Sequence, residues 1–436
     1  MVAIHPFRAL RYSPDVIGDL SRVIAPPYDI IEAEEQERLY QASSYNIVRL
    51  ILGKQYPTDT SEDNRYTRAQ RDFRAWRERQ ILRADPAPAL YLIEHTFDDD
   101  GGRSCARLGF IALLELGDSI ERLIYRHEAT LAAPTEDRTK LFEAVPANLS
   151  PIFCVYPDPW RAVQTLLEAA VRRAPPTTQA TIHGERIRLW ALTDPSLIQE
   201  IAQRLASVAV LIADGHHRFE VAYAKRRRYG KLMSYFVSME DPALVVRPIQ
   251  RVVRHEERAD LSQALQGLCA IERAADLSSL MRWLKEDDGQ GRFGAYDGHA
   301  LYRVTAHPAH LARWLMSPSV CLPLATLDVS LLHGLILPSL GVSPSGADPA
   351  RAGDGAADPA TQPRHGKDSG AGVRYTADAA RALQMVDQGE GNSAWLLRGI
   401  SLRQVYALAA QGFALPPKST YFYPKVPSGL TINPLA

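Results

Sequence analysis

The 436-residue sequence has little of several features that would narrow its function at once. It contains four cysteines that lie far apart without a CxxC pair, so neither a disulfide framework nor a zinc module is indicated. Lys and Arg number 50, as do Asp and Glu, which makes the formal net charge zero. A chain without a basic field has no general means of gathering nucleic acid, so nucleic acid is not an expected partner.

Long apolar runs and an export signal are lacking as well. No uninterrupted apolar stretch approaches the roughly 18 residues needed to cross a bilayer. Residues 1–20 contain Pro6, Arg8, Arg11 and Pro14, which interrupt the apolar centre that a signal peptide requires. We therefore expect a cytoplasmic protein without a membrane partner. The sequence carries no sign of a particular oligomeric state.

The common nucleotide-binding and hydrolase motifs are missing too. The sequence has no GxxxxGK[ST], no GxGxxG after a predicted strand, no GxSxG and no HExxH. These absences argue against a P-loop, a dinucleotide-binding turn, a hydrolase nucleophile elbow and a zincin metal site. Any chemistry must come from a less familiar arrangement of residues.

What the sequence does contain is an alternation of predicted strands and helices. This alternation predicts an α/β to α+β fold, with a mixed sheet and flanking helices. Strands are predicted over residues 45–50, 90–97, 106–116, 150–156, 208–213, 234–238, 245–253, 393–397 and 419–423, with a further hairpin over 293–304. Helices are predicted over residues 32–41, 65–80, 194–206, 375–388 and 401–411, from residue 134 onward, and from residue 215 to near residue 230.

The length of the chain allows more than one domain. We predict a mixed α/β core over residues 1–255, an α+β extension over 256–340, and a C-terminal segment over 373–436 that packs back on the core. Residues 341–372 consist largely of Gly, Ala, Pro, Ser and Asp. Such a composition buries too little apolar surface to offset the entropy of ordering, so this segment is predicted to be a disordered insertion.

The strongest candidate site is the segment Asp214–Arg218, where an apolar predicted strand meets a helix. Gly215 allows a ligand to approach the backbone closely, and the first N–H groups of the helix are donors at the positive end of its dipole. His216, His217 and Arg218 can add donors to the same anion. Alternatively, Asp214 only caps the helix and pairs with Arg218 four residues on, and the histidines are surface or core groups.

A second polar group lies at His127 and Glu128, ahead of the predicted helix that contains Arg138. A histidine beside a glutamate can supply a general base or a metal ligand. Equally, the segment can be a solvated loop followed by an ion pair between Glu136 and Lys140 within the helix.

A third group is C-terminal, where Lys418, Ser419, Thr420 and Lys425 flank an aromatic strand. Phosphate binding or base stacking is one interpretation. The alternative is an edge strand of the core with solvated lysines.

Two further segments are interpreted as structural. Ala25–Asp29, with two adjacent prolines, is predicted to be a rigid turn that can contain a cis proline. The basic run Lys225–Arg228 is interpreted as the solvated end of a helix.

Several of these segments together resemble a known family. From one end of the chain to the other, they are similar to the bacterial and archaeal domain-of-unknown-function family numbered 1015. This resemblance names a family without assigning a chemistry. The segments that carry it are Ala25–Asp29, Tyr45–Leu50, His127–Thr130 with Glu136–Arg138, Asp214–Arg218 and Pro417–Lys425.

The segment Asp214–Arg218 has a second, more distant resemblance. An apolar strand followed by Gly-His-His-Arg and a helix is similar to the phosphate-binding signature of the ParB/sulfiredoxin superfamily, which includes free serine kinases, sulfinic-acid repair enzymes and CTP-binding switch proteins. The resemblance implies a ParB/sulfiredoxin-like core in which Gly215, His217 and Arg218 hold nucleotide phosphates. His216 stands where sulfiredoxins have their reactive cysteine, so thiol-based repair is not implied.

These patterns lead to one functional hypothesis and two alternatives. We expect a nucleotide-dependent kinase or phosphotransferase that acts on a hydroxyl-bearing small molecule, for example an amino acid such as serine, with ATP, ADP or CTP bound together with Mg²⁺. The alternatives are a nucleotide-binding regulatory switch without turnover, and a metal-dependent hydrolase. The candidate residues are Glu128, Asp214 and His216 for catalysis; Glu128 and Asp214 for Mg²⁺; Gly215, His217, Arg218, Lys418, Ser419 and Thr420 for phosphate; and His127, Arg138 and Lys425 as further members of the site.

Overall fold

The structure, a computed structural model, describes residues 1–99, 101–117, 120–128, 130, 132–255, 261–286, 291–317, 320–342 and 372–435. The chain divides into two compact units. Unit 1 comprises Met1–Arg126, Thr130–Val245 and Phe422–Ala436, and unit 2 comprises His127–Ala129 and Val246–Tyr421. Each unit therefore contains segments that are distant in the sequence. The predicted disordered insertion lies, apart from its end residues, outside the described residues.

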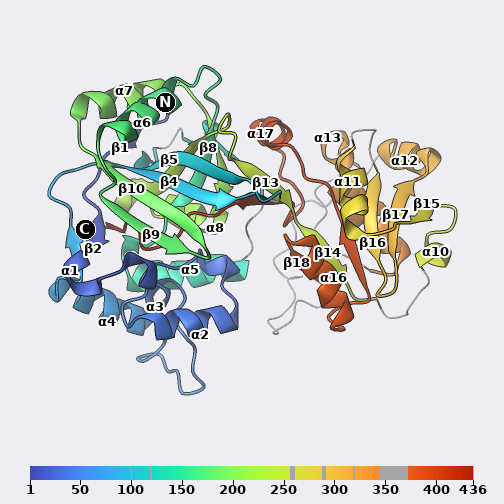
Figure 1. The fold of residues 1–436 in the computed structure, drawn as a ribbon, viewed down its shortest axis with the longest axis horizontal. Helices are drawn as coiled ribbons and strands as arrows, with labels where there is room; N and C mark the ends of the chain where they lie inside the picture. Colours follow the sequence, from blue (N-terminus) through green and yellow to red (C-terminus); the bar gives the residue numbers. More distant parts are fainter. Residues whose placement is uncertain are drawn as a thin grey trace. The chain divides into compact units, whose positions relative to one another are not determined.

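Unit 1 is built on a mixed sheet that has nine strands within the described residues (Figure 1). Its order is β6-β11-β8-β12-β5-β4-β10-β9, and β1 pairs with β5. The pairs β6–β11 and β8–β12 are parallel, and the other neighbours are antiparallel. This confirms the predicted mixed sheet. The strands are β1 (Ile4–His5), β4 (Leu90–Asp98), β5 (Ser104–Glu115), β6 (Ile124–Arg126), β8 (Ile152–Tyr156), β9 (Thr178–Ile182), β10 (Glu185–Leu192), β11 (Val210–Asp214) and β12 (Lys231–Ser238).

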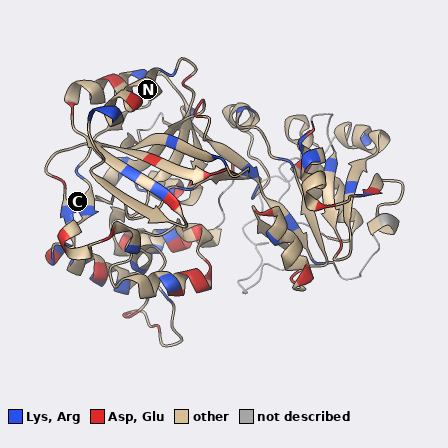
Figure 2. Ribbon diagram, in the orientation of Figure 1, with Lys and Arg blue, Asp and Glu red and all other residues tan. Residues whose placement is uncertain are grey.

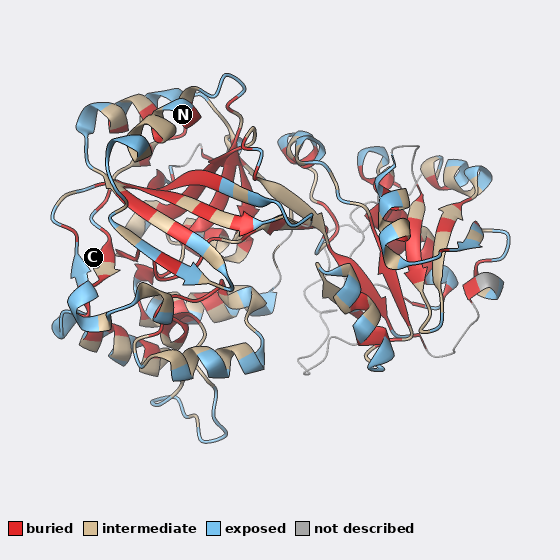
Figure 3. Cartoon of the chain, viewed as in Figure 1, coloured by how far each residue is buried: buried red, intermediate tan, exposed pale blue. Residues whose placement is uncertain are grey.

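Helices flank this sheet, as the sequence predicted. α6 (Ala162–Arg173) and α7 (Pro195–Leu205) pack their apolar residues against the strands in one buried cluster. A second cluster joins α3 (Val48–Ile51), α4 (Arg65–Glu78) and α5 (Ala132–Ala144), which lie on the opposite side of the sheet in Figure 1. Figure 3 shows the central strands buried and the outer faces of these helices exposed. Amphipathic helices of this kind hold a sheet between two apolar layers.

The other elements of unit 1 are short or lie at its periphery. Acidic and basic residues alternate over the outer helices (Figure 2), which agrees with the zero net charge. The elements are α1 (Pro14–Ile17), η1 (Leu20–Arg22), η2 (Tyr28–Ile30), α2 (Ala33–Ala42), η3 (Ile120–Arg122), α8 (His216–Ala224) and α9 (Arg226–Tyr229), together with β2 (Leu10–Tyr12), β3 (Leu82–Ala84), β7 (Ala147–Asn148) and β21 (Asn433–Pro434).

Unit 2 contains an antiparallel sheet of order β15-β17-β16-β19-β14-β18. α11 (Leu277–Lys285) and α16 (Ala379–Asp387) pack together with it in one apolar cluster. The strands are β14 (Gln250–Val253), β15 (Cys269–Arg273), β16 (Arg292–Tyr296), β17 (Leu301–Ala306), β18 (Val373–Thr376) and β19 (Ser393–Leu396). The remaining helices are α10 (Leu261–Ala264), α12 (Pro308–Leu315), α13 (Leu322–Ala325), α14 (Asp328–Leu331), the π-helix η4 (Leu332–Ile336), α15 (Leu337–Ser339) and α17 (Leu402–Ala410). The chain passes between the units in β13 (Val245–Pro248) and β20 (Thr420–Tyr423).

Two predicted elements are wrong. Residues 45–50 were expected to form a strand, but Val48–Ile51 is the short helix α3. The Asn46 side chain fixes its start: Oδ1 accepts a hydrogen bond from the Val48 N–H at 2.9 Å, and Nδ2 donates to the carbonyls of Arg22 and Ile24. Burial of this β-branched segment among the helices of unit 1 outweighs its preference for a strand.

The second error concerns residues 375–388, which were predicted to be helical throughout. Val373–Thr376 is strand β18, paired with β14, and the helix begins only at Ala379. Asp378 marks the boundary because its side chain accepts hydrogen bonds from the N–H groups of Ala380 and Arg381.

Among the described residues, no helix is long and apolar enough to cross a membrane.

Candidate functional site

The turn between β11 and α8 has the predicted strand-glycine-helix geometry. Gly215 adopts a φ of 94°, and a Cβ there would lie 2.9 Å from both Ile152 Cγ2 and Arg218 Nη2. A side chain at this position would be strained as well as crowded. The N-cap residue of α8 is Gly215 itself, so the cap position contributes no side-chain hydrogen bond. The turn places the start of the helix directly beside the end of the strand.

Asp214, the last residue of β11, receives a cation on each carboxylate oxygen. Lys425 Nζ lies 2.6 Å from Oδ1, and Arg218 Nη2 lies 2.7 Å from Oδ2. Lys425 also forms an ion pair with Asp29, and Arg218 Nη1 donates to the Pro151 carbonyl. The ion pair of Asp214 with Arg218 was predicted by the alternative interpretation, in which Asp214 only caps the helix and pairs with the residue four positions on. It is one part of a larger network.

Lys425 is a permanently charged member of this network. Its side chain is only 8% exposed. Burial by itself lowers the pKa of the Lys425 ammonium, but the carboxylates of Asp214 and Asp29 outweigh burial and raise the pKa well above its ordinary value. The backbone just before Lys425 is anchored by buried Arg107, which donates to the carbonyls of Tyr423 at 3.0 Å and Pro424 at 2.5 Å.

A second guanidinium lies close to this network. Arg138, on α5, stacks on the ring of Tyr28, with Cζ 3.8 Å from the ring centroid. Arg138 Nη1 donates to the Ile51 carbonyl at 2.9 Å, and the same guanidinium pairs with Asp137. Burial raises the pKa of the Tyr28 hydroxyl, so Tyr28 remains a neutral hydrogen-bonding group at physiological pH.

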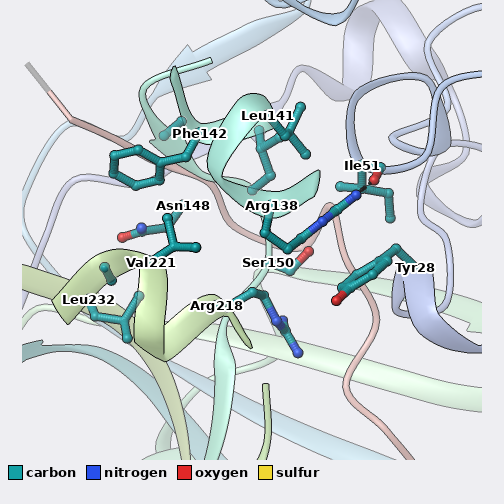
Figure 4. A pocket seen from close by; sticks show the side chains of 13 residues that line it. Tyr28, Ile51, Arg138, Leu141, Phe142, Asn148, Ser150, Arg218, Val221 and Leu232 are labelled. Atoms are coloured by element: carbon teal, nitrogen blue, oxygen red, sulfur yellow. Dashed lines mark hydrogen bonds between the residues drawn. The ribbon is translucent and has the colours of Figure 1, made fainter. Parts of the chain in front are cut away.

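These side chains border a pocket in unit 1 (Figure 4). Tyr28, Arg138, Ser150 and Arg218 lie together on one side of it, and Phe142 and Leu232 lie on the other. The pocket thus joins a cationic, hydrogen-bonding end to an apolar end. Such a pocket suits a ligand that has both an anionic group and an apolar body. The full lining is Tyr28, Ile51, Arg138, Leu141, Phe142, Ala147, Asn148, Leu149, Ser150, Arg218, Val221, Ala222 and Leu232.

Comparison with known proteins supplies the family. The family described as "Protein of unknown function (DUF1015)" matches residues 4–330. The chain belongs to this family. The match confirms the resemblance that the sequence motifs carried. No curated protein matches the chain.

Solved structures similar to this DUF1015 chain share little sequence with it. A conserved hypothetical protein from Pyrococcus furiosus is 12% identical, with a TM-score of 0.36, over 74% of this chain and 95% of that one. A free serine kinase in complex with AMP is 11% identical, with a TM-score of 0.35, over 72% and 86%. SbnI from Staphylococcus aureus, with a C-terminal truncation, is 11% identical, with a TM-score of 0.35, over 74% and 87%.

The two histidines of the turn differ in their surroundings. His216, the first residue of α8, is buried, with 6% of its surface exposed. His217 is half-buried. The roles of the two histidines stay predictions. The structure brings together in unit 1 the following part of the predicted site: Asp214, Gly215, Arg218, Arg138 and Lys425.

The other predicted site residues belong to unit 2. His127 Nε2 lies 2.9 Å from Thr420 Oγ1, and the Ser419 hydroxyl donates to the Pro416 carbonyl at 2.5 Å. Glu128 forms a backbone bridge with Leu415. Lys418 is exposed. The structure thus brings His127, Glu128 and Thr420 to one place, and their convergence with the Asp214 turn stays a prediction.

Sequence reasoning missed Arg251, the largest polar side chain buried in this part of unit 2. Arg251 is fully buried, donates to the Lys418 carbonyl at 3.0 Å, and lies 3.2 Å from His333 Nε2. Burial lowers the pKa of Arg251 to about 10 and the pKa of His333 to about 3. The neighbouring sequence does not indicate that this arginine is buried. Arginine is usually exposed to solvent, so burial is not predicted until the partners that satisfy its guanidinium are known.

Sequence reasoning also missed Asp29 and Tyr28 as members of the unit 1 site. The Ala25–Asp29 turn was interpreted as structural, with a cis proline as one option, and the structure has no cis peptide bond within it. In the described part of the chain, the cis peptide bond is Tyr423–Pro424, directly before Lys425.

The ion pair between Glu136 and Lys140, which was predicted for the helix that contains Arg138, is present: Lys140 Nζ lies 2.7 Å from Glu136 Oε1.

The predicted Mg²⁺ ligands do not fit a protein-bound metal ion as they stand. Both oxygens of Asp214 carry cationic partners, so the carboxylate would have to exchange Lys425 or Arg218 for a metal ion. Glu128, the second predicted ligand, belongs to unit 2. The described residues contain no group of three His, Cys, Asp or Glu side chains that could hold a metal ion.

Proposed function

We propose that unit 1 binds the phosphates of a nucleotide and transfers a phosphoryl group to a hydroxyl-bearing small molecule, for example an amino acid such as serine. The observation that carries this proposal is the ion-pair network at the Gly215 turn, where Asp214 lies between Lys425 and Arg218. Arg218 also lines the pocket in which Arg138 and Tyr28 meet. Phosphoryl transfer needs this combination of positioned cations and nearby carboxylates.

The cations have separate roles in the proposal. Arg138 and Arg218 face the pocket and bind phosphate oxygens, because a guanidinium matches the geometry of an oxyanion with paired hydrogen bonds. Lys425 lies between Asp29 and Asp214 and holds these two carboxylates together. Its ammonium keeps the local charge balanced while the phosphoryl group moves.

The base for the substrate hydroxyl is Asp214. In the structure its Oδ2 accepts a hydrogen bond from Arg218 Nη2. An entering phosphate competes with this carboxylate for the same guanidinium. When Arg218 turns to the phosphate, Asp214 Oδ2 becomes able to accept the hydroxyl proton. Phosphate binding thereby prepares the base that the transfer requires.

The apolar end of the pocket accommodates the body of the ligand. Leu141, Phe142, Val221 and Leu232 provide a surface against which a nucleobase can pack. A nucleotide brings its own Mg²⁺ on its phosphates in this proposal, because Asp214 is already paired. ATP, ADP and CTP are the nucleotides to compare.

A second candidate function is a nucleotide-binding switch without turnover. The observation that favours it is that both oxygens of Asp214 are engaged in the structure. If the nucleotide only replaces Asp214 as the partner of Arg218, binding changes the ion-pair network and transfers nothing. The metal-dependent hydrolase has no such support, because the described residues contain no group of three His, Cys, Asp or Glu side chains that could hold a metal ion.

One experiment separates these functions. The full chain is incubated with each nucleotide and Mg²⁺, with and without a panel of amino acids and sugars, and phosphorylated product is measured. Transfer that depends on an acceptor and is abolished in Asp214→Asn supports the kinase. Nucleotide binding without product in any mixture supports the switch. Failure of all three nucleotides to bind overturns both.

A further inference from the structure

A second pocket in unit 1 lies outside the proposed phosphoryl-transfer site. It is formed where the end of α5 faces the end of α8 and the short helix α9. We call it the α5–α9 pocket. Phe142 lines this pocket and the first one, so the two pockets are separated by a shared side chain. Its lining is Phe142, Glu143, Pro146, Ala224, Lys225, Arg227, Arg228 and Tyr229.

The lining carries a local excess of positive charge. Three cations, Lys225, Arg227 and Arg228, face it against one carboxylate, Glu143. Lys225 pairs with Glu143 at 2.9 Å. Arg227 and Arg228 are exposed, and neither makes an ion pair within the described residues. Because the chain as a whole has no net charge, this excess belongs to the pocket rather than to a generally basic surface.

Helix stability does not account for the basic run. Basic side chains are favoured at the carbonyl end of a helix, but the effect is confined to the last turn and is small for a helix as short as α9. Like charges on one short helix repel each other, and each added arginine increases that repulsion. Four successive cations therefore exceed what capping the helix requires.

Aromatic rings hold part of this charge in place. The rings of Phe142 and Tyr229 meet edge to face, with centroids 5.4 Å apart. The Arg228 guanidinium lies over the Tyr229 ring at 5.1 Å, and the neighbouring Arg226 lies over the Tyr223 ring at 4.0 Å. Stacked guanidinium groups lose less freedom when they bind an anion, so the pocket is partly organised for one.

We infer that the α5–α9 pocket binds a small molecule that carries a diphosphate group. Two exposed guanidinium groups and one ammonium group can together contact the oxygens of two linked phosphates. A nucleic acid strand is a poor match, because the cations of this pocket are confined to one helix end. This site lies beyond the proposed phosphoryl-transfer site and does not depend on it.

The test is a calorimetric titration of the full chain with pyrophosphate and, separately, with inorganic phosphate, at low salt. Wild type is compared with the double variant Arg227→Ala/Arg228→Ala. The matched control is Arg172→Ala/Arg173→Ala, which removes two adjacent, exposed arginines from the last turn of α6. We expect wild type to bind pyrophosphate more tightly than phosphate. The affinity for pyrophosphate should fall about tenfold or more in Arg227→Ala/Arg228→Ala and stay unchanged in Arg172→Ala/Arg173→Ala.

Three results would overturn the inference. Wild type could show no pyrophosphate binding, or the two double variants could lose affinity equally, which would indicate a general charge effect. Alternatively, affinity could fall in Arg138→Met and not in Arg227→Ala/Arg228→Ala. That outcome would show that pyrophosphate binds in the first pocket, which Arg138 lines. It would reject the inference about the α5–α9 pocket and would not contradict the proposed function. Thermal melts of each variant confirm that a lost affinity is not a lost fold.

Discussion

The ammonium group of Lys425 lies 2.6 Å from Oδ1 of Asp214. Asp214 ends strand β11, whereas Lys425 follows β20 near the C-terminus, and the same ammonium pairs with Asp29 near the N-terminus. One buried cation thus connects three segments that are distant in the sequence. The stability of unit 1 and the arrangement of its candidate site depend on the same contact.

Replacing Lys425 by methionine should destabilise unit 1 strongly. The substitution removes the shared cation and leaves two carboxylates close together, and breaking a buried ion pair costs roughly 3 to 5 kcal/mol. Because Asp29 is partly exposed, we expect the loss to fall near the lower end of that range. Urea unfolding of the full chain measures it.

Lys140→Met is the matched control, because Lys140 makes an exposed ion pair with Glu136 on α5. Such pairs contribute little to stability, because water screens the two charges. Equal stability losses in Lys425→Met and Lys140→Met would show that the Lys425 network is not a structural contact of unit 1.

Replacing Arg218 by alanine should weaken nucleotide binding. Arg218 supplies one or two charge-assisted hydrogen bonds to phosphate in the proposal, at roughly 1.5 to 3 kcal/mol each, so affinity should fall about tenfold to a hundredfold or more. A loss of stability accompanies this change, since Arg218 also bonds Asp214 and the Pro151 carbonyl. Calorimetry with ATP, ADP and CTP, beside thermal melts, separates the two effects.

Arg204→Ala provides the comparison for Arg218. Arg204 lies on α7 and pairs with Glu200 four residues earlier, with both side chains well exposed. We expect it to change neither affinity nor stability measurably. Unchanged affinity in Arg218→Ala, with wild type binding at least one nucleotide, would end the assignment of Arg218 to phosphate.

Substituting Gly215 by alanine should destabilise the turn by roughly 1 to 3 kcal/mol, because a non-glycine residue is strained at a positive φ. The added Cβ also meets Ile152 Cγ2 at 2.9 Å. Gly184→Ala is the control: Gly184 has a φ of 81°, and a Cβ there meets nothing within 4 Å. Thermal melts should show a larger loss for Gly215→Ala, and an equal loss would mean that crowding at the turn contributes nothing.

Acidification should destabilise unit 2 through His333. Burial lowers its pKa in the folded chain to about 3, whereas an unfolded histidine titrates near 6.5. Between these values the unfolded chain binds the proton and the folded chain does not, so stability falls as the pH falls from about 6.5 toward 3. His333→Gln, which keeps an acceptor for Arg251, should lose less stability over this range. Denaturant unfolding at several pH values measures the difference, and identical pH profiles would contradict the prediction.

Local patterns were sufficient to predict several parts of the fold. Asp194 followed by Pro195 predicted the start of α7, where the Asp194 side chain accepts hydrogen bonds from the first N–H groups. The strands β4 and β5 and the strand-glycine-helix turn at Gly215 were also predicted. In each case the signal lies within a few consecutive residues, because caps, tight turns and alternating apolar residues act over short distances.

Tertiary packing decided the cases in which local preference and burial disagree. The β-branched residues of segment 45–50 favour a strand, but Val48 and Ile51 are buried in the helical cluster of unit 1 and belong to α3. Asn46 adds hydrogen bonds to backbone groups of residues 22 and 24, which no pattern near Asn46 could indicate.

The composition of the candidate site shows the same division. The sequence by itself determined the Gly215 turn, with Asp214 and Arg218 on either side of it, because a strand, a glycine and a helix follow one another there. Only the tertiary structure decided that Lys425 and Asp29 join Asp214, and that Arg138 stacks on Tyr28 beside them. Ion pairs and cation–π contacts act through space, so a residue far away in the sequence leaves no periodicity or spacing from which its partner could be read.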